Sequence, residues 1–200
     1  MAGFDALKKV VEAKAKVVCR DIELNPEALK FLDSDPSPVE FLNVLLVQAL
    51  YPDAIRFLAR ALPKREATWW ACICTRGVLP KDAPALSLRA LEAAEQWVYK
   101  PTEDNRRLAE AAANATAFDG PASWAAMAAF WSDGSIAPEN AAPVNAPDFL
   151  ASRAAAGAVM LAAVLTEPEK APEKYRYFVE QGVDIANGGN GRPWQCDSGE

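Results

Sequence analysis

Helix breakers divide this chain into segments of about 10 to 20 residues, and nearly every segment places its apolar residues at helical spacing. Many prolines stand at the start of such a segment. The first N–H groups of a helix have no acceptor within the helix, so proline, which has no N–H group, fits there without losing a hydrogen bond. The alternation of apolar and polar residues that is typical of strands is almost absent. Only Val17–Ile22 resembles a strand, and the end of a helix explains it better. The pattern therefore predicts an all-α fold.

The composition indicates one domain with a substantial core. Of the 200 residues, 40 are alanine, which has the highest helix propensity and lets helix axes approach closely. The hydrophobic fraction of 51% excludes a disordered chain. We predict a single compact domain over residues 1–187, with about eight or nine helices arranged as αα-hairpins, and a flexible tail at 188–200. The helices are expected at 3–18, 38–50, 52–62, 65–76, 85–99, 102–117, 121–132, 147–165 and 172–187, with a short helix at about 26–33.

The clearest helix start is the sequence Ser37-Pro38-Val39-Glu40. The serine hydroxyl can accept the backbone N–H of Glu40, while the glutamate carboxylate reaches back to the N–H of Ser37. Proline at the first helical position strengthens the signal. Farther along, Gly77 is expected to end a helix in the left-handed conformation.

The absence of histidine excludes Ser-His-Asp and Cys-His nucleophilic systems, histidine general bases and most catalytic zinc sites. The net charge is −6, and neither half of the chain is basic enough for a phosphate-binding surface, so we do not expect a nucleic-acid partner. The glycines near Gly188 have no strand before them and no helix after them, as a phosphate loop would require. No cofactor is expected.

The four cysteines predict neither a metal site nor a disulfide framework. Cys72 and Cys74 are two residues apart, so on a helix they point in different directions, and no second pair stands at zinc-ligand spacing. We expect reduced cysteines that act as small apolar core residues. The chain starts without the features of a signal peptide, and its longest apolar stretch, Ala154–Leu165, is shorter than the ~20 residues of a membrane span. These features predict a cytoplasmic protein.

The segment 3–18 reads as a basic amphipathic helix, with Phe4, Leu7 and Val11 on one stripe and lysines elsewhere. Such a helix can lie on a membrane surface or bind a partner. The plainer interpretation, which we prefer, is a surface helix packed on its own core.

The stretch Arg56–Cys72 is the most informative, because adjacent tryptophans stand on one helix about 100° apart. Both rings can belong to the core, since each buries on the order of 200 Å². Alternatively, one ring with an arginine stacked on it forms a binding hot spot. We do not expect catalysis by Glu66, the one glutamate of this stretch, because no second carboxylate stands at the fixed spacing that acid–base hydrolysis needs. The candidate interaction residues are Arg60, Arg65, Glu66, Trp69 and Trp70.

Arg56–Cys72, with the later stretches Trp124–Ser132, Ala154–Leu165 and Tyr175–Phe178, resembles an all-helical bacterial protein family of about this length. The resemblance covers about residues 25–187 and brings no established activity. Members of that family are associated with type VI secretion gene clusters, so the resemblance implies an accessory or adaptor protein.

We therefore expect a non-enzymatic adaptor whose partner is another protein, such as a secretion-system component. The alternatives are a small-ligand-binding protein or enzyme with a pocket lined by Trp, Arg and Glu, and a membrane-surface protein that uses residues 3–18. The predicted core consists of Phe41, Leu45, Ile55, Leu58, Leu62, Trp70, Leu91, Leu108, Trp124, Met127 and Val159.

Overall fold

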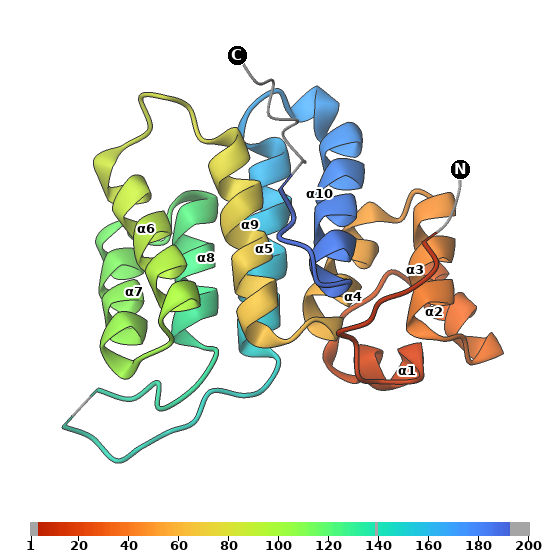
Figure 1. Cartoon of the computed structure of the whole chain (residues 1–200), viewed down its shortest axis with the longest axis horizontal. Helices are drawn as coiled ribbons and strands as arrows, with labels where there is room; N and C mark the ends of the chain where they lie inside the picture. Colours follow the sequence, from red (N-terminus) through yellow and green to blue (C-terminus); the bar gives the residue numbers. More distant parts are fainter. Residues whose placement is uncertain (1–3, 139, 193–200) are drawn as a thin grey trace.

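The computed structural model describes residues 4–138 and 140–192, and the prediction of an all-α fold is confirmed (Figure 1). The described residues form ten α-helices, three short 3₁₀ helices and their connections. In chain order these are α1 Ala15–Val18, η1 Cys19–Asp21, α2 Pro26–Lys30, η2 Phe31–Ser34, α3 Pro38–Val47, α4 Tyr51–Ala61, α5 Lys64–Val78, α6 Ala85–Tyr99, α7 Glu103–Ala115, α8 Gly120–Phe130, α9 Leu150–Leu165, η3 Pro168–Lys170 and α10 Ala171–Ala186.

Local capping chemistry sets several of these boundaries. The capping box of α3 is present: Ser37 N donates to Glu40 Oε2 at 2.8 Å, and Glu40 N donates to Ser37 Oγ at 3.4 Å. The expected left-handed cap at Gly77 is wrong, because Gly77 lies inside α5, which continues to Val78. The helix ends there because Leu79 is extended, as the residue before a proline prefers to be.

The expected helix over residues 3–18 is also wrong. Only Ala15–Val18 is helical, and residues 4–14, which we call the N-terminal segment, lie across α3 and the end of α10 without helical structure. Phe4 N donates to Asn43 Oδ1 at 2.8 Å, Asn43 Nδ2 donates back to Phe4 O at 2.9 Å, and Lys9 N donates to Ala186 O at 2.8 Å. These partners satisfy backbone groups that a helix would satisfy internally, so tertiary contacts override a weak local preference.

Helices α5 and α9 occupy the centre of the molecule (Figure 1). On one side lie α6, α7 and α8, and on the other lie α10 and α1 to α4. α9 packs against α8, α5 and α4. Both helices are rich in buried alanine, at positions Ala122, Ala125, Ala126, Ala128 and Ala129 in α8 and Ala151, Ala154, Ala155, Ala156, Ala158, Ala162 and Ala163 in α9. The small side chains allow the two backbones to lie close together, as the sequence predicts.

Nine of the eleven predicted core residues are buried: Phe41, Leu45, Ile55, Leu58, Leu62, Trp70, Leu91, Met127 and Val159. Trp124 is half-buried and covers Gly157 of α9. The prediction that Leu108 is buried is wrong, because its side chain is 52% exposed. The inward stripe of α7 consists of Asn105, Arg106, Ala109 and Ala113, and it turns Leu108 toward solvent.

Residues 188–192, where the flexible tail is expected to begin, make defined contacts. Trp69 Nε1 donates to Asn190 O at 2.9 Å, and Gln181 Nε2 donates to Gly191 O at 2.8 Å. Residues 193–200 of the expected tail lie outside the described residues. No helix in the described part of the chain is both long enough and apolar enough to cross a bilayer.

Close packing of α10 on α4 and α5 depends on Gly182. A Cβ atom at this position would lie 2.6 Å from Leu58 Cδ2 and 2.9 Å from Trp70 Cε2, and the indole ring cannot bend away. We expect Gly182→Ala to lower the free energy of unfolding by about 1–3 kcal/mol in urea denaturation, because overpacking displaces core residues.

Gly77→Ala is the matched control, since a Cβ atom on Gly77 meets nothing within 4 Å. That variant should be neutral or stabilising by up to about 1 kcal/mol, because alanine favours a helix more than glycine does. Equal stability of the two variants would contradict the close approach of α10.

Candidate functional site

Three of the five candidate interaction residues line one pocket. The N-terminal part of α5 contributes Arg65, Glu66 and Trp69, and the end of α6 contributes Val98 and Tyr99. Lys9 of the N-terminal segment, Ile185 of α10, and Gly189, Asn190 and Arg192 complete the lining. The pocket has a volume of about 370 Å³ and is open to solvent, and we call it the Trp69 pocket.

Helical geometry and two polar contacts orient the charged residues of this pocket. Arg65 and Trp69 are four residues apart on α5 and therefore share a face. Arg65 Nε donates to Val98 O at 2.6 Å, so the cation lies at the C-terminus of α6, where the helix dipole favours positive charge. Glu66 forms an ion pair with Lys9, with 3.2 Å between Oε1 and Nζ.

Trp69 lies between an aromatic ring and a cation. Its ring centroid is 5.9 Å from that of Tyr99 in an edge-on arrangement, and the Arg192 guanidinium lies 5.0 Å from its centroid. The indole N–H donates to Asn190 O, so the polar edge of the ring is engaged while Arg192 lies over its face. This arrangement is typical of binding surfaces, where tryptophan and arginine contribute most of the affinity.

The other two candidate residues lie elsewhere. Trp70 is fully buried, and its Nε1 donates to Phe178 O at 2.7 Å, so this ring is part of the core. Arg60 pairs with Asp148, with 2.9 Å between Nη2 and Oδ2. Adjacent residues on one helix point about 100° apart, which explains why only one tryptophan reaches the surface.

Two further pockets neighbour the Trp69 pocket through shared lining residues. The second, of about 290 Å³, is lined by Lys9, Lys64, Arg60 and Asp148 among others. The third, of about 170 Å³, is lined by Arg60, Arg56 and Arg153 together with Asp21 and Glu23. Lys9 lines the first and second pockets, and Arg60 lines the second and third. We call these three consecutive pockets the furrow.

The furrow carries both signs of charge, and most of its charged groups are paired at the surface. The hydrogen bond from Lys64, together with the positive charges of Lys64 and Arg60, holds the pKa of Asp148 below its ordinary value. Within residues 4–138 and 140–192, no group of three or more His, Cys, Asp or Glu side chains could hold a metal ion.

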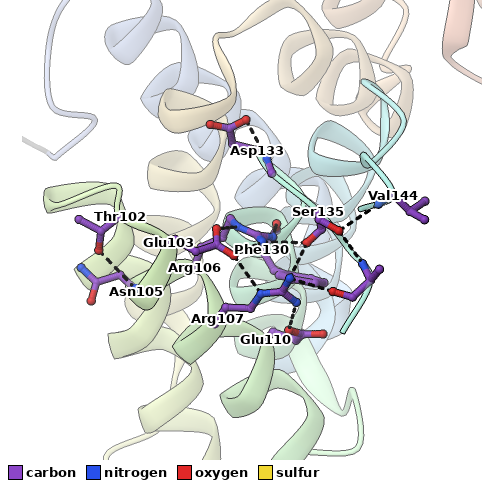
Figure 2. Close-up of polar contacts among 12 residues, drawn as sticks. Thr102, Glu103, Asn105, Arg106, Arg107, Glu110, Phe130, Asp133, Ser135 and Val144 are labelled. Carbon is purple, nitrogen blue, oxygen red and sulfur yellow. Dashed lines mark hydrogen bonds and ion pairs between the residues drawn. The ribbon is translucent and has the colours of Figure 1, made fainter. Parts of the chain in front are cut away.

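The structure also contains a pair of adjacent arginines, one buried and one half-buried, that the sequence analysis did not identify (Figure 2). Arg106 is 2% exposed, and it donates to Glu103 at 2.6 Å, to Phe130 O at 2.8 Å and to Ser135 O at 2.8 Å. Arg107 donates to Ser135 O at 3.0 Å, and both guanidiniums lie over the Phe130 ring. The sequence signal is a glutamate three and four residues before two arginines.

The arginine pair attaches the loop between α8 and α9 to the first turns of α7. This loop contains residues 133–146, the longest loop expected from the sequence, and Figure 2 shows Ser135 as the point where both guanidiniums meet it. The Ser135 hydroxyl also accepts the backbone N–H of Val144 at 3.0 Å, which closes the loop on itself. The pair therefore has a structural role, and it lies apart from the furrow.

The described cysteines are free and buried, in agreement with their expected role in the core. Burial raises the pKa of Cys19 to about 12, and burial likewise raises the pKa values of Cys72 and Cys74. The thiolate form is therefore disfavoured at neutral pH. Cys196 lies outside the described residues.

Arg106→Ala should lower the free energy of unfolding by about 2–4 kcal/mol, because it leaves the buried carbonyl of Phe130 without a donor and removes the stacked guanidinium. Urea denaturation followed by circular dichroism measures the change. Arg89→Ala, at an exposed position of α6, should change stability by less than about 0.5 kcal/mol. A similar small effect for Arg106→Ala would show that the loop attachment is dispensable.

The hydrogen bond from Arg106 lowers the pKa of Glu103. A carboxyl whose pKa is lower in the folded state stabilises the fold above its unfolded pKa, and this contribution disappears as the pH falls through the folded value. The stability difference between the wild type and Glu103→Gln should therefore be largest near about pH 7 and vanish by about pH 2. Urea denaturation over this range tests it, and a difference that does not depend on pH would rule out ionisation of Glu103 as its cause.

Comparison with known proteins gives one match. No curated protein and no solved structure matches the chain. Residues 41–186 match the model described as Family of unknown function (DUF6931). The matched range contains the stretch Arg56–Cys72, on which the expected resemblance depends, and it contains Arg65, Glu66 and Trp69 of the Trp69 pocket. The chain belongs to the Family of unknown function (DUF6931).

Proposed function

We propose that this protein is a non-enzymatic adaptor that binds an extended segment of a partner protein along the furrow. One observation carries the proposal: four of the five candidate residues line three neighbouring pockets, of which the first two share Lys9 and the last two share Arg60. A series of small neighbouring pockets suits the side chains of an extended polypeptide better than one compact metabolite.

The chemistry of the furrow supports a polypeptide ligand. The Trp69 pocket offers an aromatic ring with a cation on it, and the next two pockets offer guanidinium groups paired with carboxylates. Aromatic and arginine side chains contribute most to affinity at protein interfaces, while exposed ion pairs contribute selectivity. We therefore assign the main share of the affinity to the Trp69 end.

The finer part of the proposal is a bacterial, cytoplasmic protein that assists a secretion system. Its support is the resemblance of Arg56–Cys72 and the later tryptophan-containing stretches to proteins with that association.

A small-ligand-binding protein is the second candidate. The Trp69 pocket alone, at about 370 Å³, is large enough for a small organic molecule. Its two arginines and one lysine against a single glutamate would favour an anion. Native mass spectrometry of the protein purified from its natural host measures this alternative directly.

Site-specific photo-crosslinking in the natural host tests the adaptor proposal. Tyr99 is 68% exposed and lines the Trp69 pocket, whereas Tyr177 of α10 is 44% exposed and lines none of the three pockets of the furrow. We expect a benzophenone amino acid at position 99 to capture one protein that the same probe at position 177 does not. Adding Trp69→Ala should lower the yield by at least about tenfold, because truncation of a hot-spot residue costs 2 kcal/mol or more.

Two results would contradict the adaptor proposal. One is capture of the same proteins in the same yield from positions 99 and 177. The other is an unchanged yield after Trp69→Ala in a variant whose circular dichroism shows that it remains folded. A co-purifying small molecule without any captured protein would support the second candidate instead.

A further inference from the structure

The main chain of residues 189–192 is recognised by side chains of α5 and α10. Trp69 donates to the carbonyl of Asn190 at 2.9 Å, and Gln181 donates to the carbonyl of Gly191 at 2.8 Å. The N–H of Gly191 donates to Asp184 Oδ2 at 2.8 Å. These groups contact backbone atoms that every peptide has, so the same contacts are open to an extended segment of another protein.

Gln181 is itself positioned for this role. Its Oε1 accepts from the Cys74 thiol at 3.7 Å, which leaves Nε2 to face Gly191. Because Cys74 is fully buried, the amide is held by the core of the protein and not by the segment that it binds. Two of the three contacts to this segment therefore depend on α5: Trp69 belongs to α5, and Gln181 is held by Cys74 of α5.

Steric constraints select glycine at position 191. Its φ is +69°, a conformation that β-branched residues avoid. A Cβ atom there would lie 2.5 Å from Ile73 Cδ1 and 2.8 Å from Ile185 Cδ1. The next residue is selected by charge and shape, because the Arg192 guanidinium lies on the Trp69 ring at 5.0 Å. The site therefore favours a glycine followed by an arginine.

The binding residues lie inside the range that matches the family model, and the bound segment lies outside it. Trp69, Ile73, Gln181, Asp184 and Ile185, which we call the seat, all lie within the matched residues 41–186. Residues 189–192 lie outside them. The seat is thus built by the matched part of the chain, while the segment that fills it follows the matched range.

We propose that the seat is a binding site for an extended partner segment that carries a Gly-Arg step, and that residues 189–192 fill it in cis. The proposal rests on the proposed function, since the seat shares Trp69 with the furrow and would hold one end of the same partner segment. A tethered segment competes at an effective concentration in the millimolar range, so the partner must gain further contacts along the furrow to replace it.

A peptide-binding experiment on the full chain tests the proposal. The probe is acetyl-Gly-Gly-Asn-Gly-Arg-amide, which reproduces residues 188–192, and isothermal titration calorimetry measures its affinity. Gly191→Val should eject the tethered segment and raise the affinity for the probe at least about tenfold over the wild type, where only the open fraction binds. Gly77→Val is the matched control, because a Cβ atom there meets nothing within 4 Å, and it should bind as weakly as the wild type.

Two further measurements keep the proposal open to contradiction. Arg192→Ala weakens the tethered segment without added bulk, and it should raise the affinity for the probe severalfold even if Gly191→Val folds poorly. Replacing the second-last residue of the probe by valine, or its arginine by glutamate, should abolish binding to both variants. Adding Gln181→Ala to Arg192→Ala should also weaken binding, because it removes the donor to the glycine carbonyl.

The proposal is overturned if folded Arg192→Ala and Gly191→Val bind the probe no better than the wild type, or if the valine probe binds as well as the glycine probe. A wild-type dimer that dissociates on Gly191→Val would assign the seat to a second copy and would also overturn it. Probe binding without a crosslinked host protein would leave the seat intact and reject the proposed adaptor function, so the two failures are distinguishable.

Discussion

The close contact of α8 with α9, made by alanine, is the constraint on which the remaining structure depends. Because most of the buried side chains of both helices are alanine, their backbones can lie close together, and α9 also contacts α5 and α4. α5 is thereby held in the middle of the molecule, with α6 and α8 on one side and α10 on the other. A larger residue at this contact would separate α9 from α8 and shift every helix that packs on them.

The position of α5 explains why both described ends of the chain meet at one place. The side-chain amides of Asn43 and Asn187 each donate to and accept from the backbone of the N-terminal segment, which places Lys9 beside Glu66. On the opposite edge of the pocket, residues 189–192 lie on Trp69. The Trp69 pocket is therefore lined by α5, α6 and Ile185 of α10, which fall within the family match, and by two segments that lie outside it.

Part of this site could be predicted from the sequence. Arg65, Glu66 and Trp69 occupy one side of a helix by their spacing alone, and the periodicity of α5 indicates that helix correctly. Periodicity does not say which of two adjacent tryptophans faces the core, since that depends on where α10 packs. Periodicity also could not reveal Lys9 or Arg192. The apolar spacing of the N-terminal segment predicts a helix, and only contacts with other elements hold that segment, and residues 189–192, beside Trp69.

By itself the sequence determined the fold class, most helix boundaries and most of the core, because capping, proline starts and apolar spacing act within a few residues of one another. The tertiary structure decided which side chains form the site. Lys9 and Glu66 are 57 residues apart, and Trp69 and Asn190 are 121 apart. Such contacts form only when the helices pack. The alanine content permits this packing, but it does not specify which helix faces contact each other.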